Sequence, residues 1–209
     1  MPLQAALAKT IEHLSGEFDS IPEERQKALE GLSRFISSSI EKDGKALLNF
    51  ICTHNSRRSH LAQFWAQAAA VYYDIPGVFC YSGGTEATAF NPRSVEAMKE
   101  AGFMITRKTE GANPVYSVQL GPDIAPMLAF SKKYDDEVNP KSGFAAVMTC
   151  SHADQHCPLV MGASRRFPIT YEDPKDFDDT PKEGPAYRER VRQIGREMLY
   201  AFSVIKTNP

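Results

Sequence analysis

One apolar run that ends at a cysteine constrains the fold of this chain more than any other feature. Residues 46–51 (Ala-Leu-Leu-Asn-Phe-Ile) predict a buried parallel strand, and Cys52 follows directly. A polar turn comes next, and residues 61–73 are rich in alanine and apolar side chains, which predicts a helix. The turn between a strand and a helix is where doubly wound sheets bind their ligands.

Strand and helix patterns continue to alternate along the chain. Residues 78–81, 144–149 and 166–170 predict three further strands, and residues 183–205 predict a long closing helix. Asn91 is suited to cap another helix, because Pro92 follows at its first position. Strands that alternate with helices predict an α/β fold with a four-stranded parallel sheet and flanking helices.

Two segments depart from this alternation. Residues 1–44 predict an N-terminal helical hairpin of amphipathic helices, which covers apolar surface or forms an oligomer contact. Residues 45–209 form the predicted catalytic domain, with an insertion at about 112–143. Within the insertion, residues 115–120 and 127–134 predict a β-hairpin. A lid over the site, a dimer contact and plain surface structure are all open as its role.

Composition and charge exclude several classes of function. The formal net charge of −2 gives no basic field, so nucleic acid is not an expected partner. No apolar run approaches the roughly 18 residues of a membrane span, and the N-terminus lacks the pattern of a secretory signal. We therefore expect a cytoplasmic protein with no membrane partner. In that reducing compartment, the 4 cysteines serve in catalysis, metal binding or core packing rather than in a disulfide framework.

The residues after Cys52 are suited to bind a tetrahedral oxyanion. Backbone N–H groups of the turn and of the helix start form an anion cradle, and the same positive field favours the thiolate of Cys52. Arg58 offers a fork of donors for two oxygens of the anion, whereas the adjacent Arg57 points elsewhere. The Ser59 hydroxyl is placed to donate to the sulfur, and the Asn55 amide to hold the tight loop. The candidate oxyanion-binding residues are Thr53, His54, Asn55, Ser56, Arg57, Arg58 and Ser59.

The pattern Cys-x-x-Asn-x-x-Arg-Ser at residues 52–59 resembles the phosphate-binding loop of low-molecular-weight protein tyrosine phosphatases and of the thioredoxin-coupled arsenate reductases built on the same fold. The similarity continues through residues 81–86 (Tyr-Ser-Gly-Gly-Thr-Glu) and spans about 46–111 and 144–205. The resemblance implies the fold of this superfamily and a nucleophilic role for Cys52. The alternative, a buried core cysteine that precedes a turn, leaves the full pattern without a reason.

A second pair of cysteines bears on the choice between these two activities. Cys150 follows the third predicted strand, and Cys157 comes seven positions later. The resemblance implies that they are the resolving thiols of an arsenate reductase, which the phosphatases do not require. One alternative is a structural pair in a phosphatase. Another is a zinc site without a familiar spacing, made of Cys150, His152, His156 and Cys157. Cys80 lies in a predicted strand, and we expect it in the core.

An acid is needed to protonate the oxygen that leaves the substrate. Asp173 and Pro174 follow the last predicted strand and resemble the acid loop of this superfamily, which implies that Asp173 is the general acid. The residue after the proline is Lys175, whereas the phosphatases carry an aromatic residue there that shapes a phosphotyrosine slot. This departure favours the reductase over the tyrosine phosphatase.

The sequence and the resemblance together predict an arsenate reductase that converts arsenate to arsenite. Cys52, Arg58 and Asp173 would act on arsenate, and Cys150 and Cys157 would pass the oxidation to an external thioredoxin-type partner. No bound cofactor and no metal are expected. The main alternative is a phosphatase that hydrolyses a phosphate ester or a phosphoprotein through a phosphocysteine intermediate. A third alternative is a non-catalytic module that binds an oxyanion.

Overall fold

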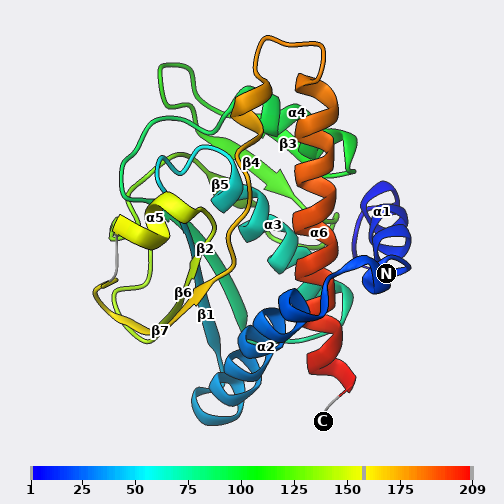
Figure 1. The fold of residues 1–209 in the computed structure, drawn as a ribbon, viewed down its shortest axis with the longest axis vertical. Coiled ribbons are helices and arrows are strands. Elements are labelled where there is room, and N and C mark those ends of the chain that lie inside the picture. The colour runs from blue at the N-terminus through cyan, green and yellow to red at the C-terminus, as the bar shows by residue number, and fades with distance from the viewer. Residues whose placement is uncertain (1, 157–158, 208–209) are drawn as a thin grey trace.

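A parallel sheet forms the centre of the molecule in the computed structural model, which describes residues 2–156 and 159–207 (Figure 1). Its strand order is β2-β1-β6-β7. All neighbouring strands in it are parallel, which confirms the predicted fold class. The strands are β1 (Ala46–Cys52), β2 (Val78–Gly84), β6 (Phe144–Met148) and β7 (Ala163–Pro168).

Helices cover one face of this sheet in two layers. α3 (Arg58–Tyr72) packs on β1 and β2, and α2 (Glu23–Asp43) packs on β1 and β7. The long α6 (Glu183–Thr207) lies against α2 and α3, and α1 (Ala5–Ser15) and α4 (Pro92–Glu100) flank it (Figure 1). α4 begins as predicted, because the Asn91 side chain accepts hydrogen bonds from the N–H groups of Arg93 and Ser94.

Side chains of β1 alternate between two apolar clusters, as the pleat of a strand requires. Leu48 and Phe50 point into the main core under the helices. Ile51 joins a smaller cluster on the opposite face, which also contains Ala153 of the short helix α5 (Ser151–His156). Both faces of the sheet are therefore buried near the end of β1, which explains its nearly continuous apolar sequence.

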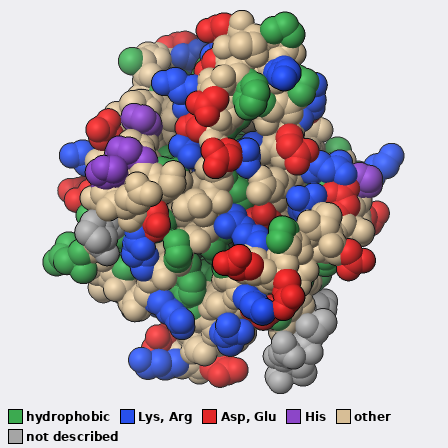
Figure 2. All heavy atoms as spheres, viewed as in Figure 1, with side chains coloured by type: hydrophobic (Ala, Val, Ile, Leu, Met, Phe, Trp, Pro, Cys, Tyr) green, Lys and Arg blue, Asp and Glu red, His purple; other side chains and the backbone are tan. Residues whose placement is uncertain are grey.

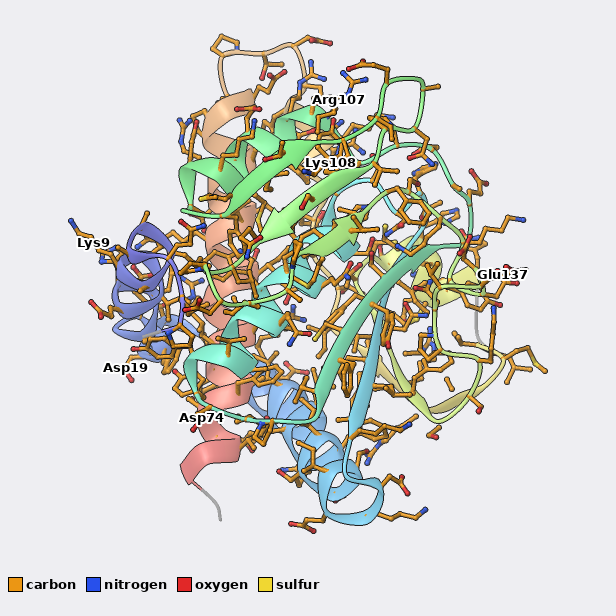
Figure 3. The ribbon with its side chains drawn as sticks, turned by 180° about the vertical axis from the view of Figure 1, so that it is seen from behind. Lys9, Asp19, Asp74, Arg107, Lys108 and Glu137 are labelled. Atoms are coloured by element: carbon orange, nitrogen blue, oxygen red, sulfur yellow. The ribbon has the colours of Figure 1, made fainter. Side chains whose placement is uncertain are left out.

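The N-terminal helices belong to the same core as the rest of the chain. Buried residues of α1 and α2, among them Leu7, Ile11 and Leu32, form one cluster with Trp65 and Phe202. Lys9, on the outer side of α1, points away from the molecule (Figure 3). A short 3-10 helix, η1 (Phe18–Ser20), separates α1 from α2.

The insertion contains the predicted β-hairpin, and a strand that precedes the insertion extends the hairpin to a three-stranded sheet. β4 (Tyr116–Gln119) and β5 (Met127–Ala129) pair in antiparallel fashion, and β3 (Met104–Arg107), which the sequence pattern did not predict, pairs with β4. Arg107 and Lys108 lie at one end of this second sheet (Figure 3). After β5 the chain returns to the main sheet, where Lys133 bridges to Gly84 at the end of β2.

The order of the strands creates a switch point between β1 and β6. From β1 the chain moves outward to β2 through α3, and it later crosses back to add β6 and β7 on the other side. Ligands of open α/β sheets bind at such a point, beyond the carboxyl ends of the strands. Cys52 ends β1 and Cys150 follows β6, so both thiols lie at this edge. Among the described helices, none has both the length and the apolar character that crossing a bilayer requires.

Candidate active site

Asn55 holds the loop between β1 and α3 in its shape. Its φ of 45° lies in the left-handed region, which asparagine tolerates better than most residues. The side chain is fully buried and donates to Ser59 Oγ at 2.9 Å and to Ser82 Oγ at 3.0 Å. Its Oδ1 accepts the N–H of Lys132 at 3.0 Å. Asn55 thus joins the loop to α3, to β2 and to the insertion, as a residue that pins the loop would.

The Cys52 sulfur lies within the loop, and it is 3% exposed. Ser59 Oγ is 3.1 Å from Cys52 Sγ. Because this hydroxyl already accepts a hydrogen bond from Asn55, its own proton is free to point at the sulfur. A hydroxyl that donates to sulfur stabilises the thiolate, the form that acts as a nucleophile.

The backbone of the loop offers unused donors. The N–H groups of residues 54–57 make no hydrogen bond to any residue that the structure describes. They precede the first turn of α3, whose N–H groups and dipole also favour an anion. Successive free N–H groups ahead of a helix make a concavity suited to phosphate-like anions.

Two neighbouring segments support the loop from outside. The N–H groups of Thr85 and Glu86, after β2, donate to the carbonyls of Cys52 and Thr53 at 3.1 and 2.8 Å. A Cβ atom on Gly84 would come within 2.6 Å of the Thr53 carbonyl oxygen and 2.7 Å of the Asn55 nitrogen, so only glycine fits there. From the insertion, Ser131 Oγ donates to the His54 carbonyl at 2.8 Å.

Arg58 connects the loop to the segment that carries the predicted acid. One guanidinium nitrogen donates to the Tyr171 carbonyl at 2.8 Å, and another donates to Asp173 Oδ2 at 2.6 Å. Asp173 caps a 3-10 helix, η2 (Pro174–Phe177), by accepting the N–H of Lys175 at 3.2 Å. The structure thus brings Arg58 and Asp173 together at the loop. An anion that entered it would compete with Asp173 for the guanidinium.

The other polar side chains of the loop point in different directions. Arg57 Nε donates to the Tyr187 hydroxyl of α6 at 3.0 Å, and it lies 3.9 Å from Asp173 Oδ1. His54 Nε2 lies 3.7 Å from a carboxylate oxygen of Glu86. Ser56 is buried, and its carbonyl accepts the N–H of Asn91 at 2.9 Å.

Cys150 lies beside the loop, on the neighbouring strand's end. Its side chain is 1% exposed, and its sulfur lies 3.5 Å from Thr53 Oγ1. The sulfur also accepts the N–H of Ala153, in the first turn of α5, at 3.3 Å. Cys52 and Cys150 belong to the same small buried cluster. The predicted nucleophile and the first predicted resolving thiol therefore lie at one site.

The two other cysteines of the chain are Cys157 and Cys80. Cys157 lies outside the described residues, so its predicted role as the second resolving thiol stays a prediction. Cys80 lies in β2 and is buried, as expected, and burial raises the pKa of its thiol. Cys52, Cys80 and Cys150 are free thiols. Within residues 2–156 and 159–207, no group of three or more His, Cys, Asp or Glu side chains is placed to bind a metal.

The sequence pattern missed two buried ionisable residues next to the loop. Lys132 is 5% exposed, and burial lowers the pKa of its ammonium to about 8. His60 is fully buried, so desolvation, and then the nearby Lys132, holds its pKa well below the usual value. Its Nδ1 lies 3.2 Å from Ser82 Oγ. The burial of Lys132 depends on the insertion folding back onto the loop, which no local sequence pattern predicts. The position of His60 in the first turn of α3 does indicate that it lies near the loop.

Comparisons with known proteins point to one superfamily. The chain is 30% identical over 156 residues to an arsenate reductase of Halalkalibacterium halodurans, which covers 74% of this chain and 93% of the relative. It is 31% identical over 158 residues to arsenate reductase 2 of Staphylococcus haemolyticus, with 76% and 96% covered. No protein-family model matches the chain.

Solved structures agree on the fold. A low-molecular-weight protein tyrosine phosphatase from T. tengcongensis superposes with a TM-score of 0.53 at 16% identity and covers 77% of this chain and 99% of its own. A phosphotyrosine phosphatase of the same class from Vibrio cholerae gives a TM-score of 0.51 at 10% identity, with 76% and 95% covered.

Proposed function

The chain belongs to the arsenate reductases of the low-molecular-weight phosphatase superfamily, and we propose that it reduces arsenate to arsenite with the thiols of Cys52, Cys150 and Cys157. The observation that carries this proposal is a second buried thiol at the edge of the sheet where the cysteine loop lies. Cys150 contacts that loop through Thr53, 3.5 Å away. A phosphatase needs no second thiol at this position, whereas a reductase must draw a pair of electrons from protein sulfur.

The first step is a displacement at arsenic. The Cys52 thiolate forms an S–As bond, while an oxygen leaves arsenate and takes a proton from Asp173. The loop N–H groups and Arg58 bind the remaining oxygens. Fixed donors, rather than water, therefore stabilise the negative charge on these oxygens. Asp173 lies 2.6 Å from Arg58, which keeps the acid at the site.

The second step is the reduction. The Cys150 thiolate attacks the sulfur of Cys52, an S–S bond forms, and the S–As bond breaks with its electron pair on arsenic. Arsenic passes from the +5 to the +3 state and leaves as arsenite. Cys157 then attacks Cys150, which frees Cys52 and leaves a Cys150–Cys157 disulfide for an external thioredoxin-type dithiol to reduce. Free thiols of this kind need a reducing compartment, so we place the protein in the cytoplasm.

The alternative is a phosphatase that uses the same loop. Phosphate and arsenate have the same shape and charge, and the superfamily fold hosts phosphotyrosine phosphatases. In that case Cys52, Arg58 and Asp173 would release phosphate from an ester or a phosphoprotein through a phosphocysteine intermediate.

Arsenate turnover with thioredoxin and thioredoxin reductase, measured beside hydrolysis of p-nitrophenyl phosphate on the same preparation, tests the proposal. A reductase forms arsenite and consumes NADPH in equal amounts. Brisk ester hydrolysis with all thiols still reduced after arsenate treatment would assign the protein to the phosphatases instead.

A further inference from the structure

Two histidines of α5 have no part in the mechanism above. His152 and His156 stack, with ring centroids 4.1 Å apart and an interplanar angle of 17°. Both are exposed, and Figure 2 shows histidine side chains gathered on the face over α5. They differ in one contact, because His152 Nδ1 lies 3.3 Å from the hydroxyl of Thr53, whereas His156 Nδ1 faces the backbone carbonyl of His152 at 2.9 Å.

The Thr53 hydroxyl lies between two groups that exchange protons. Cys150 Sγ is 3.5 Å from Thr53 Oγ1, and His152 Nδ1 is 3.3 Å from the same atom. A hydroxyl accepts one hydrogen bond while it donates another. The two distances therefore allow a chain in which the thiol donates to the hydroxyl and the hydroxyl donates to the imidazole, with His152 Nδ1 as the unprotonated ring nitrogen.

We propose that His152 is a positioning residue that activates Cys150, by accepting through Thr53 the proton that the thiol must lose before it attacks Cys52. This inference rests on the proposed reduction of arsenate. One proton passes from Cys150 to Thr53 Oγ1 as the hydroxyl proton passes to His152 Nδ1. The sulfur is left as a thiolate that accepts from Thr53 and from the N–H of Ala153. No oxidant or further reactant is needed for this step.

The surroundings leave His152 free for this task. Because its ring is exposed, it returns the proton to water after each turnover. The charged groups on the elements around it have partners of their own. His54 pairs with Glu86 at 3.7 Å, and Asp154 pairs with Arg166 at 2.5 Å. The stacked His156 is the other titratable ring next to it, and it serves as the matched control.

The test is a single turnover in the Cys157→Ser background, where the reaction stops at the Cys52–Cys150 disulfide. After rapid mixing with arsenate, the disulfide is followed by quenching, alkylation and mass spectrometry. His152→Asn should slow its formation at neutral pH by about 10-fold or more, since general-base help contributes at least that much. His156→Asn should change the rate less than 2-fold.

Three further readouts separate proton transfer from a structural role. The pH dependence of the rate should differ between His152→Asn and its parent, because the variant lacks the proton acceptor. Imidazole in solution should restore part of the rate to His152→Ala. In a Thr53→Val protein, which lacks the hydroxyl, His152→Asn should not slow disulfide formation any further. In a Thr53→Ser protein, which keeps the hydroxyl, His152→Asn should still slow it.

The outcomes also distinguish this inference from the proposed function. If His152→Asn forms the disulfide at the rate of its parent across the pH range, the relay is wrong, although arsenite release would leave the reductase assignment standing. If the parent forms neither arsenite nor the disulfide, both proposals are overturned.

Discussion

Two loops leave the same edge of the sheet, and they are held in different ways. The loop after β1 is fixed by buried hydrogen bonds from Asn55 to α3, β2 and the insertion, and Gly84 packs against its backbone. The turn after β6 leads into the six-residue α5, most of which is exposed. Its ties include the N–H of Ala153 on the Cys150 sulfur, the contacts of Cys150 and His152 with the Thr53 hydroxyl, and the ion pair between Asp154 and Arg166.

This difference matches the two tasks that we propose. An anion-binding loop works best when its donors are fixed before the substrate enters, since no energy is then spent on arranging them. A resolving thiol must instead move, because Cys150 has to approach first Cys52 and then Cys157. Elements with few buried contacts open at low cost, and a short exposed helix is such an element.

Replacing Cys52 and Cys150 one at a time should give the largest effects and tests whether the two loops have different tasks. Cys52→Ser should lower both arsenate reduction and ester hydrolysis by about 10⁴-fold or more, since every step passes through its sulfur. Cys150→Ser should stop arsenate turnover and leave ester hydrolysis within about 2-fold of the parent, because hydrolysis needs one thiol. Steady-state rates for both substrates, with circular dichroism as the control for folding, measure this. Full turnover by a folded Cys52→Ser protein would contradict the assignment of the nucleophile.

Asp173→Asn tests the tie between the cysteine loop and the acid loop. Loss of the acid should lower kcat by about 10²- to 10⁴-fold, most for substrates with basic leaving groups. Arg58 also loses its ionic partner at 2.6 Å, so the inhibition constant of inorganic phosphate should fall, which means tighter binding. Asp176→Asn, an exposed change in the same loop, is the control and should resemble the parent. Equal kcat values for Asp173→Asn and the parent on a poor leaving group would place the acid elsewhere.

Changes in the ties of the two loops should differ in their cost to stability. Asn55→Ala removes a buried amide and leaves the N–H of Lys132 without its acceptor, so the free energy of unfolding should fall by about 2–4 kcal/mol. Asp154→Ala removes one half-buried ion pair and should cost about 1 kcal/mol or less. Urea titrations of both variants measure these values. Equal losses would mean that the loops are held alike and that the comparison fails.

Local patterns predicted much of this molecule. The four parallel strands, the cysteine at the end of β1 and the helix capped by Asn91 follow from apolar runs, their order and a capping residue. The same local logic predicted the contacts of Asn55 and Ser59 within the loop, because both partners lie on one short segment.

The features that were missed depend on long-range packing. β3 is a four-residue strand that becomes regular by pairing with β4, and α5 is too short and polar to show a helical period. Ser131 and Lys132 reach the cysteine loop only because the insertion folds back along β2, 77 residues away from their partners in sequence. Neither the spacing of residues nor the composition of the sequence predicts that contact.

Lys132 allows a further test of how the cysteine loop is held. Its backbone N–H supports Asn55, whereas its buried ammonium has the Phe130 carbonyl at 3.4 Å and the Phe130 ring at 4.7 Å as its contacts. Burial lowers its pKa to about 8 from an ordinary 10.5. The unfolded chain therefore holds this proton more tightly than the folded one, so the charge costs stability below pH 8, and the cost disappears as the pH rises from about 8 to above 10.5.

Lys132→Met keeps the backbone N–H and most of the stem but removes the charge. At pH 7 the variant should be more stable than the parent by about 1–2 kcal/mol, which is less than the full pKa difference implies, because the ammonium contacts are lost too. This advantage should shrink as the pH rises through 8 to 10.5, while the surface control Lys133→Met should show no such trend. Urea denaturation at several pH values measures it. A variant that is less stable than the parent at pH 7 would show that the ammonium itself holds the insertion against the loop, and the support of the cysteine loop would then be electrostatic as well as hydrogen-bonded.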